Sequence, residues 1–230
     1  MRVLFICVLA TAAAADWKSK PFPEWSDETV LRVLTDSPWS HPRTVSFTWR
    51  EREQRPITYK DIPGADHGVK TGALGPLGGI GAPVSSLKDK SDIIVRWCGA
   101  LPVRHATAVY KHREAKGAGS INERIAGGEQ DYVVELFGLP AELAHQSAGV
   151  LERVIRDKAF LRMKNGTAIK ASMVEVTIFG LTLTAKIHFP RSYVITAKDG
   201  EVEIIADAKV FSVNEKFKLG PMVYLGYLEL

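Results

Sequence analysis

The sequence predicts an α+β fold, with a mostly antiparallel β-sheet in the C-terminal half and two or three helices packed against it. Three observations support this prediction. Residues 181–189 alternate apolar and polar side chains, as in a half-buried strand. The pair Asn165-Gly166 tolerates the positive φ of a tight hairpin turn. Residues 143–155 place apolar side chains on one face at helical spacing.

The first predicted elements are a helix and a strand. Ser26 can cap a helix from Asp27 to about Thr35, and Pro38 follows its end. The apolar stripe of this helix is Val30, Leu31 and Leu34. Residues 43–52 then favour a strand, because apolar side chains recur at every second position. These side chains are Val45, Phe47 and Trp49.

The middle of the chain alternates strands and helices. Residues 92–98 are typical of a buried strand, and Pro102 suits the first turn of a helix that ends before Gly117. Residues 132–137 predict a second strand, and Pro140 predicts the start of another helix. The apolar face of that helix is Leu143, Val150, Leu151, Val154 and Ile155.

The C-terminal part is predicted to be almost entirely β. Strands at 159–164 and 167–179 flank Asn165-Gly166, and Gly180 shifts the alternation by one residue, which indicates a tight turn or a bulge. Asp199-Gly200 predicts a further hairpin. The last predicted strands are 201–206, 209–213, 217–219 and 223–230.

Residues 61–90 differ in composition from the rest, being rich in Gly, Pro, Ala and Ser, which favours a flexible surface loop. The loop separates an N-terminal helix and strand in 16–60 from an α+β part in 91–230, and we expect 16–230 to form one folded unit. A phosphate-binding loop is disfavoured, because Val69 separates Gly68 from Lys70. No cofactor is predicted.

The first fifteen residues have the pattern of a secretory signal peptide. Arg2 precedes an apolar run from Val3 to Ala15, which ends in small alanines before the charged Asp16. The run is shorter than the roughly 20 apolar residues that a membrane-spanning helix needs. We therefore expect an exported protein, periplasmic or extracellular, whose mature chain has no transmembrane segment. The alternative is a buried N-terminal helix over residues 3–15.

Removing the signal peptide leaves Cys98 as a lone cysteine, since Cys7 lies within the apolar run. A single thiol cannot form an intramolecular disulfide, so the fold must depend on its core. Cys98 follows a strand of apolar residues, where a free cysteine usually packs as a small hydrophobe rather than acting as a nucleophile.

Charge and motifs exclude several classes of function. The mature chain has 29 basic and 26 acidic residues, a net charge of +3, without the basic stripe typical of a nucleic-acid interface. No metal site is predicted, because the ligand spacings of known metal motifs are missing. His105 and His112 lie two helical turns apart, too far to share a metal ion, and we interpret them as part of a solvated basic face. Tryptophans crowd the start of the mature chain, and we expect them in the core or an interface rather than stacked on a bound sugar. They are Trp17, Trp25, Trp39 and Trp49.

Three segments carry a family resemblance: residues 35–39 (TDSPW), 95–104 (VRWCGALPVR) and 217–224 (FKLGPMVY). They resemble a group of uncharacterised exported bacterial proteins that is common in acidobacteria. The resemblance covers most of the mature chain and implies that the three segments lie together in the fold. It implies no activity, because the group has none established.

Two hypotheses about function follow. The first is a non-catalytic domain that binds a ligand or an envelope partner, with Trp97, Arg104 and the 61–89 loop as candidates for one pocket. The second is an exported hydrolase of unrecognised type. Its candidate polar residues are Ser37, His41, His105 and His112.

Overall fold

The computed structural model describes residues 16–18, 20–48, 89–114, 130–144 and 147–230. The described strands all pair in antiparallel fashion and the described helices lie at the ends of the sheets, which confirms the predicted α+β class. The predicted signal peptide, Trp49 and almost all of the 61–90 loop lie outside the described residues.

Two sheets form the body of the described part. The first has five strands in the order β1-β2-β3-β7-β6. These strands are β1 Ser40–Ser46, β2 Lys90–Trp97, β3 Tyr132–Pro140, β7 Thr182–Phe189 and β6 Met173–Phe179. The second has four strands in the order β5-β4-β8-β9. These are β5 Ala168–Lys170, β4 Ala159–Met163, β8 Glu201–Asp207 and β9 Ser212–Lys218.

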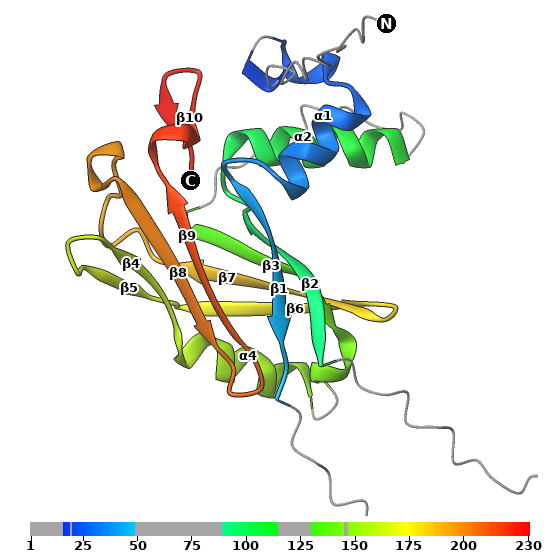
Figure 1. Cartoon of the computed structure of the whole chain (residues 1–230), viewed down its shortest axis with the longest axis vertical. Helices are drawn as coiled ribbons and strands as arrows, with labels where there is room; N and C mark the ends of the chain where they lie inside the picture. The colour runs from blue at the N-terminus through cyan, green and yellow to red at the C-terminus, as the bar shows by residue number, and fades with distance from the viewer. Residues whose placement is uncertain (1–15, 19, 49–88, 115–129, 145–146) are drawn as a thin grey trace, which may run out of the picture.

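The inner faces of both sheets share one hydrophobic core, which draws residues from Trp17 to Leu230. On one side, edge strand β1 lies beside edge strand β9 (Figure 1). On the other, the chain passes from β5 into β6 without a loop. The Ala171 N–H donates to the Ala159 carbonyl of one sheet, and the next N–H, of Ser172, donates to the His188 carbonyl of the other.

Helices cover the two ends of this sandwich (Figure 1). Helices α1 (Asp27–Thr35) and α2 (Leu101–Glu114) pack on each other at one end, and α4 (Ala148–Asp157) packs against β6 and β8 at the other. A small hairpin, β10 (Val223–Tyr224) and β11 (Tyr227–Leu228), lies near the C-terminus. Short 3₁₀ helices are η1 Asp16–Lys18, η2 Phe22–Glu24, η4 Ala141–Ala144, η5 Ala197–Asp199 and η6 Gly220–Met222.

The first helix follows the prediction closely. The Ser26 hydroxyl accepts a hydrogen bond from the Thr29 N–H, 3.1 Å away, which satisfies a free donor of the first turn. Its buried apolar side chains are Val30, Val33 and Leu34, whereas Leu31 is exposed. The stripe is therefore rotated by a fraction of a turn, because the helix faces α2.

The predicted start of the second helix, at Pro140, is wrong. Pro140 is the last residue of β3, and α4 begins only after Ser147, whose hydroxyl accepts from the Val150 N–H at 3.1 Å. Leu143 belongs to η4 instead.

Several strand predictions also need correction. The predicted strand 167–179 is two strands, β5 and β6, because the chain changes sheets at Ala171. Asp199-Gly200 ends η5 and joins no hairpin, since β7 and β8 lie in different sheets. Residues 208–211 form the turn before β9, and the predicted strands 209–213 and 217–219 are replaced by the single strand β9. The predicted strand 223–230 is the β10–β11 hairpin. By contrast, the tight turns at Gly166 and Gly180 are confirmed, with φ of 89° and 59°.

Candidate functional site

The three segments singled out by the sequence meet in one aromatic cluster. The Trp97 N–H donates to the Trp39 carbonyl at 2.9 Å, and the Trp97 ring meets Phe217 edge-on with centroids 6.0 Å apart. The Trp39 ring meets Tyr224 in the same way at 6.4 Å. The Trp39 indole N–H also donates to the Glu229 carbonyl at 3.1 Å. These contacts hold the C-terminal segment against the turn that follows α1.

Trp97, a predicted ligand residue, lies fully inside the core between Tyr132 and Phe217. Its indole nitrogen is buried without a hydrogen-bond partner among the described residues. Arg104 lies in α2 and is half-buried. The pocket expected around these two residues would include the 61–89 loop, which lies outside the described residues except for Asp89. Ligand binding by Trp97 and Arg104 stays a prediction.

His105 is buried, which corrects its interpretation as part of a solvated face. Its ring stacks on Phe22 with centroids 4.0 Å apart and meets Trp25 and Tyr224 edge-on. Burial, and then the charge of Arg104, lower the pKa of His105 to about 4. The imidazole is therefore neutral at pH 7 and packs as an aromatic side chain.

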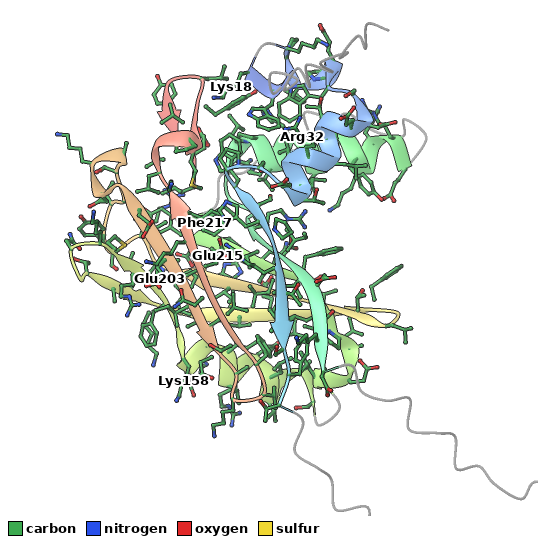
Figure 2. The ribbon with its side chains drawn as sticks, in the orientation of Figure 1. Lys18, Arg32, Lys158, Glu203, Glu215 and Phe217 are labelled. Atoms are coloured by element: carbon green, nitrogen blue, oxygen red, sulfur yellow. The ribbon has the colours of Figure 1, made fainter. Side chains whose placement is uncertain are left out.

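A second group of polar residues joins the edges of the two sheets. We call Glu215, His41 and Arg43 the edge cluster. The Glu215 side chain, on β9, is only 1% exposed, and its Oε1 lies 2.6 Å from His41 Nδ1 and 2.8 Å from Arg43 Nη2. Arg43 Nε donates to the other carboxylate oxygen. Figure 2 shows Glu215 and Phe217 along β9, next to β1.

The electrostatics of the edge cluster keep Glu215 charged. Burial by itself would raise the pKa of Glu215, but hydrogen bonds from Arg43 and His41 outweigh it and hold that pKa below its usual range. A carboxylate that accepts from the Nδ1–H of an imidazole fixes the tautomer in which Nε2 is an acceptor. The His41 side chain is 26% exposed and stacks on Phe217 at 4.1 Å. The cluster can thus hold an oriented general base.

The sequence pattern indicates His41 as a candidate but not Glu215, which is 174 residues away. The predicted strands 209–213 and 217–219 left Glu215 in the gap between them. A usable signal was present, because Val213, Glu215 and Phe217 share the inward face of β9. A carboxylate at an inward position needs a partner from another element.

Ser37 does not join His41 in a nucleophile–base pair. The Ser37 hydroxyl donates to the Val33 carbonyl at 2.8 Å and accepts from the Trp39 N–H. Ser37 thus closes the turn after α1.

The outer face of the five-stranded sheet carries a row of alternating charges in register across four strands. The row is Arg96, Glu135, Lys186 and Glu175. Arg96 pairs with Glu135 and donates to the Leu34 carbonyl at 3.0 Å, which connects α1 to the sheet.

Burial, followed by the nearby Glu135 charge, raises the pKa of Cys98. Its thiol stays protonated, which suits packing better than nucleophilic attack.

The surface of the described residues includes two hollows that open to solvent. One, of about 570 Å³, lies between α4 and β6 and is lined by Glu152, Arg153, Arg156 and Glu175, among others. The other, of about 440 Å³, lies between the end of β1 and the turn that precedes β9. Within the described ranges no group of three or more His, Cys, Asp or Glu side chains is placed to hold a metal ion. No described helix has both the length and the apolar character to cross a membrane.

The most exposed large apolar side chains of the described part lie at the turn between β6 and β7. We call Ile178, Phe179, Gly180 and Leu181 the β6–β7 tip. Phe179 is 86% exposed and Leu181 83% exposed, and Ile178 is half-exposed. A second apolar turn, the β10–β11 tip, presents Leu225 and Tyr227 at 73% and 74% exposure.

Comparisons with known proteins identify no relative: no protein-family model, no curated protein and no solved structure matches the chain.

Proposed function

We propose that this chain is an exported, non-catalytic binding domain that attaches to a component of the bacterial cell envelope through the β6–β7 tip. One observation carries the proposal: Phe179 and Leu181 are almost fully exposed at a tight turn. The signal-peptide pattern of residues 1–15 supports export to the compartment in which such a contact would form.

Exposed Phe and Leu side chains at one point of a folded domain call for an explanation. Leaving each of them in water forgoes about 1.5–3 kcal/mol of burial energy. Contiguous exposed apolar patches of this kind commonly mark interaction sites, whereas isolated exposed apolar residues are normal and need no explanation. The tip is also a hairpin turn with a fixed backbone, so binding would order little additional chain.

A sedimentation experiment tests the proposal. The chain starting at Asp16 contains every described residue, and it would be mixed with washed envelope fragments of a Gram-negative bacterium and centrifuged. We expect the wild type to sediment with the fragments and the double variant Phe179→Ser/Leu181→Ser to stay in the supernatant. The matched control, Leu225→Ser/Tyr227→Ser in the β10–β11 tip, should sediment like the wild type. A wild type that stays in the supernatant would overturn the proposal.

A hydrolase is the second candidate function, and the edge cluster is the observation that favours it. His41 has the orienting carboxylate that a general base needs, and a water molecule could serve as the nucleophile. The variant His41→Asn keeps a donor toward Glu215 but removes the base.

Screening ester, peptide and glycoside substrates would decide this second candidate. Hydrolysis that disappears in His41→Asn but persists in the control His188→Asn, on the outer face of β7, would establish it. Equal rates for the wild type and both variants would eliminate it.

A further inference from the structure

We propose that the β6–β7 tip binds the lipid bilayer itself, as a shallow apolar wedge, rather than an envelope protein. This inference rests on the proposed function, namely attachment to the envelope through this tip. It adds the chemical class of the partner: the acyl-chain boundary of a lipid surface, without selection for headgroup charge.

The tip is a fixed projection. Strands β6 and β7 are paired in register from Met173 to the Phe179–Thr182 pair, so only Gly180 and Leu181 form the turn. Gly180 at the first central position with φ of 59° is typical of a type II′ turn. The Thr182 hydroxyl donates to the Phe179 carbonyl at 3.0 Å, and the Ala141 N–H donates to the Leu181 carbonyl at 3.1 Å. Figure 1 shows this hairpin reaching out past β2 at the right-hand edge.

The composition of the tip fits the boundary between headgroups and acyl chains. Residues 177–182 (TIFGLT) include no charged side chain, and threonines flank the apolar residues on both sides. Both threonines are exposed and place hydroxyl groups just behind the apolar side chains. Apolar side chains ahead of polar ones are the arrangement of segments that lie in a membrane interface.

The size of the apolar surface favours lipid over a protein partner. Three side chains with these exposures present about 400 Å² of apolar surface. A stable protein complex buries about 800 Å² on each partner, usually over a surface shaped to match. A convex turn with half that area cannot supply such an interface by itself, whereas a lipid leaflet adapts its shape to the wedge.

Vesicle binding tests the inference, with the chain starting at Asp16 so that the apolar run of residues 1–15 makes no contribution. The probes are vesicles of phosphatidylcholine alone and of phosphatidylcholine with phosphatidylglycerol. We expect weak, reversible binding to both, on the order of 10⁴ M⁻¹ or less, since three side chains bury less surface than one acyl chain. Salt at about 0.5 M, which shortens the Debye length to a few Å, should change the affinity less than about twofold.

Two double variants provide the comparison. Phe179→Ser/Leu181→Ser should weaken vesicle binding by at least about tenfold, because it removes most of the inserted surface. Leu225→Ser/Tyr227→Ser, which changes two exposed apolar side chains at the β10–β11 tip, should bind within about twofold of the wild type. All four side chains lie at the surface, and circular dichroism would verify that both variants keep the fold.

Other outcomes separate this inference from the proposed function. Binding to envelope fragments but not to protein-free vesicles would overturn the lipid inference and leave the envelope attachment standing. Binding only to anionic vesicles, lost at high salt, would also overturn it, since net charge would then explain the association. Equal vesicle binding by the wild type and the tip variant would exclude the wedge. Failure to bind either fragments or vesicles would overturn both proposals.

Discussion

Among single residues, Glu215 connects the two sheets through hydrogen bonds to its charged carboxylate. Its carboxylate lies between edge strands β1 and β9 and accepts hydrogen bonds from two residues of β1, Arg43 and His41. A carboxylate at this depth is stable only when its acceptor positions are filled by such donors. The pairing of Glu215 with Arg43 and His41 therefore stabilises the fold and also orients His41, the candidate base.

We expect Glu215→Gln to lower the free energy of unfolding by about 2 kcal/mol, because it removes the charge that pairs with Arg43 and His41. The loss is smaller than for a fully buried pair, since Arg43 is 54% exposed and can be hydrated. Urea denaturation at pH 7 measures it. The control Glu203→Gln changes a carboxylate on the opposite face of the same sheet, paired with half-exposed Arg162, and should cost less than about 1 kcal/mol. Equal losses in both variants would contradict this account.

His105 predicts a dependence of stability on pH. Its pKa is about 4 in the folded protein and 6.5 when unperturbed, so the unfolded chain takes up a proton first as the pH falls. Stability from this residue is complete above about pH 6.5 and declines toward pH 4, by up to about 3 kcal/mol. The variant His105→Phe keeps the ring stacked on Phe22 and should remove that decline. Urea unfolding of both proteins at about pH 7 and pH 4.5 measures it, and parallel declines would refute the assignment.

Single residues are predictable from the sequence where the local pattern decides their burial. Trp25 and Trp39 are in the core as expected, and Ser26 caps its helix. His105 and Glu215 are not predictable in this way, because the residues that surround them come from distant segments. Phe22 and Tyr224, which are far apart in the sequence, both pack against the ring of His105. The spacing of residues within α2 does not predict these contacts.

Among the elements, the β6–β7 hairpin has a glycine at positive φ in its two-residue turn. Gly180→Ala would place a side chain at φ of 59° and should lower stability by about 1 kcal/mol, although nothing lies within 4 Å of the added carbon. The matched control is Gly149→Ala in α4, where the space is equally open and the backbone is helical. It should raise stability by about 0.5 kcal/mol. Thermal unfolding measures both changes, and a shift of the same sign in the two variants would contradict the turn assignment.

The sequence predicted most elements and placed their ends less well. The type of each element follows from side-chain period, which is local, and α1, α2 and β7 lie close to their predicted ranges. At the break between β5 and β6 the alternation shifts by one residue, since Ile169 and Ala171 are buried before it and Val174 after it. A shift of phase alone does not reveal that the chain changes to another sheet, so the break is not predictable from the sequence. Likewise, Pro140 does not start α4, because it is the last residue of β3 and pairs with Thr182. The residue that caps α4 is Ser147.

At the scale of the whole molecule, one core extends through both sheets and the packed helices. We therefore expect the chain from Asp16 to unfold in a single cooperative transition, with coincident near- and far-ultraviolet circular dichroism during urea denaturation. Two separated transitions would show instead that residues before and after the 61–90 segment fold as independent units.

The fold class could be predicted from the sequence, whereas the candidate binding site could not. Alternation in 181–189 predicted a strand with Leu181 on its dry face, but Leu181 is in the turn, beyond the cover of any described element. Which end of a hairpin is covered depends on the packing of the whole molecule. The apolar β6–β7 tip became visible only in the assembled structure.

The central claim is that the β6–β7 tip enters a lipid surface, and a fluorescent label beside it tests this most directly. Thr182→Cys places a thiol next to the tip and keeps Phe179 and Leu181. Cys98 should not react, because burial raises its pKa and keeps the thiol protonated. With the chain starting at Asp16, we predict that an environment-sensitive dye at residue 182 shifts to the blue on phosphatidylcholine vesicles. The same dye on Leu225→Cys, in the β10–β11 tip, should not shift. An unchanged spectrum at residue 182, or equal shifts at both positions, would contradict the account.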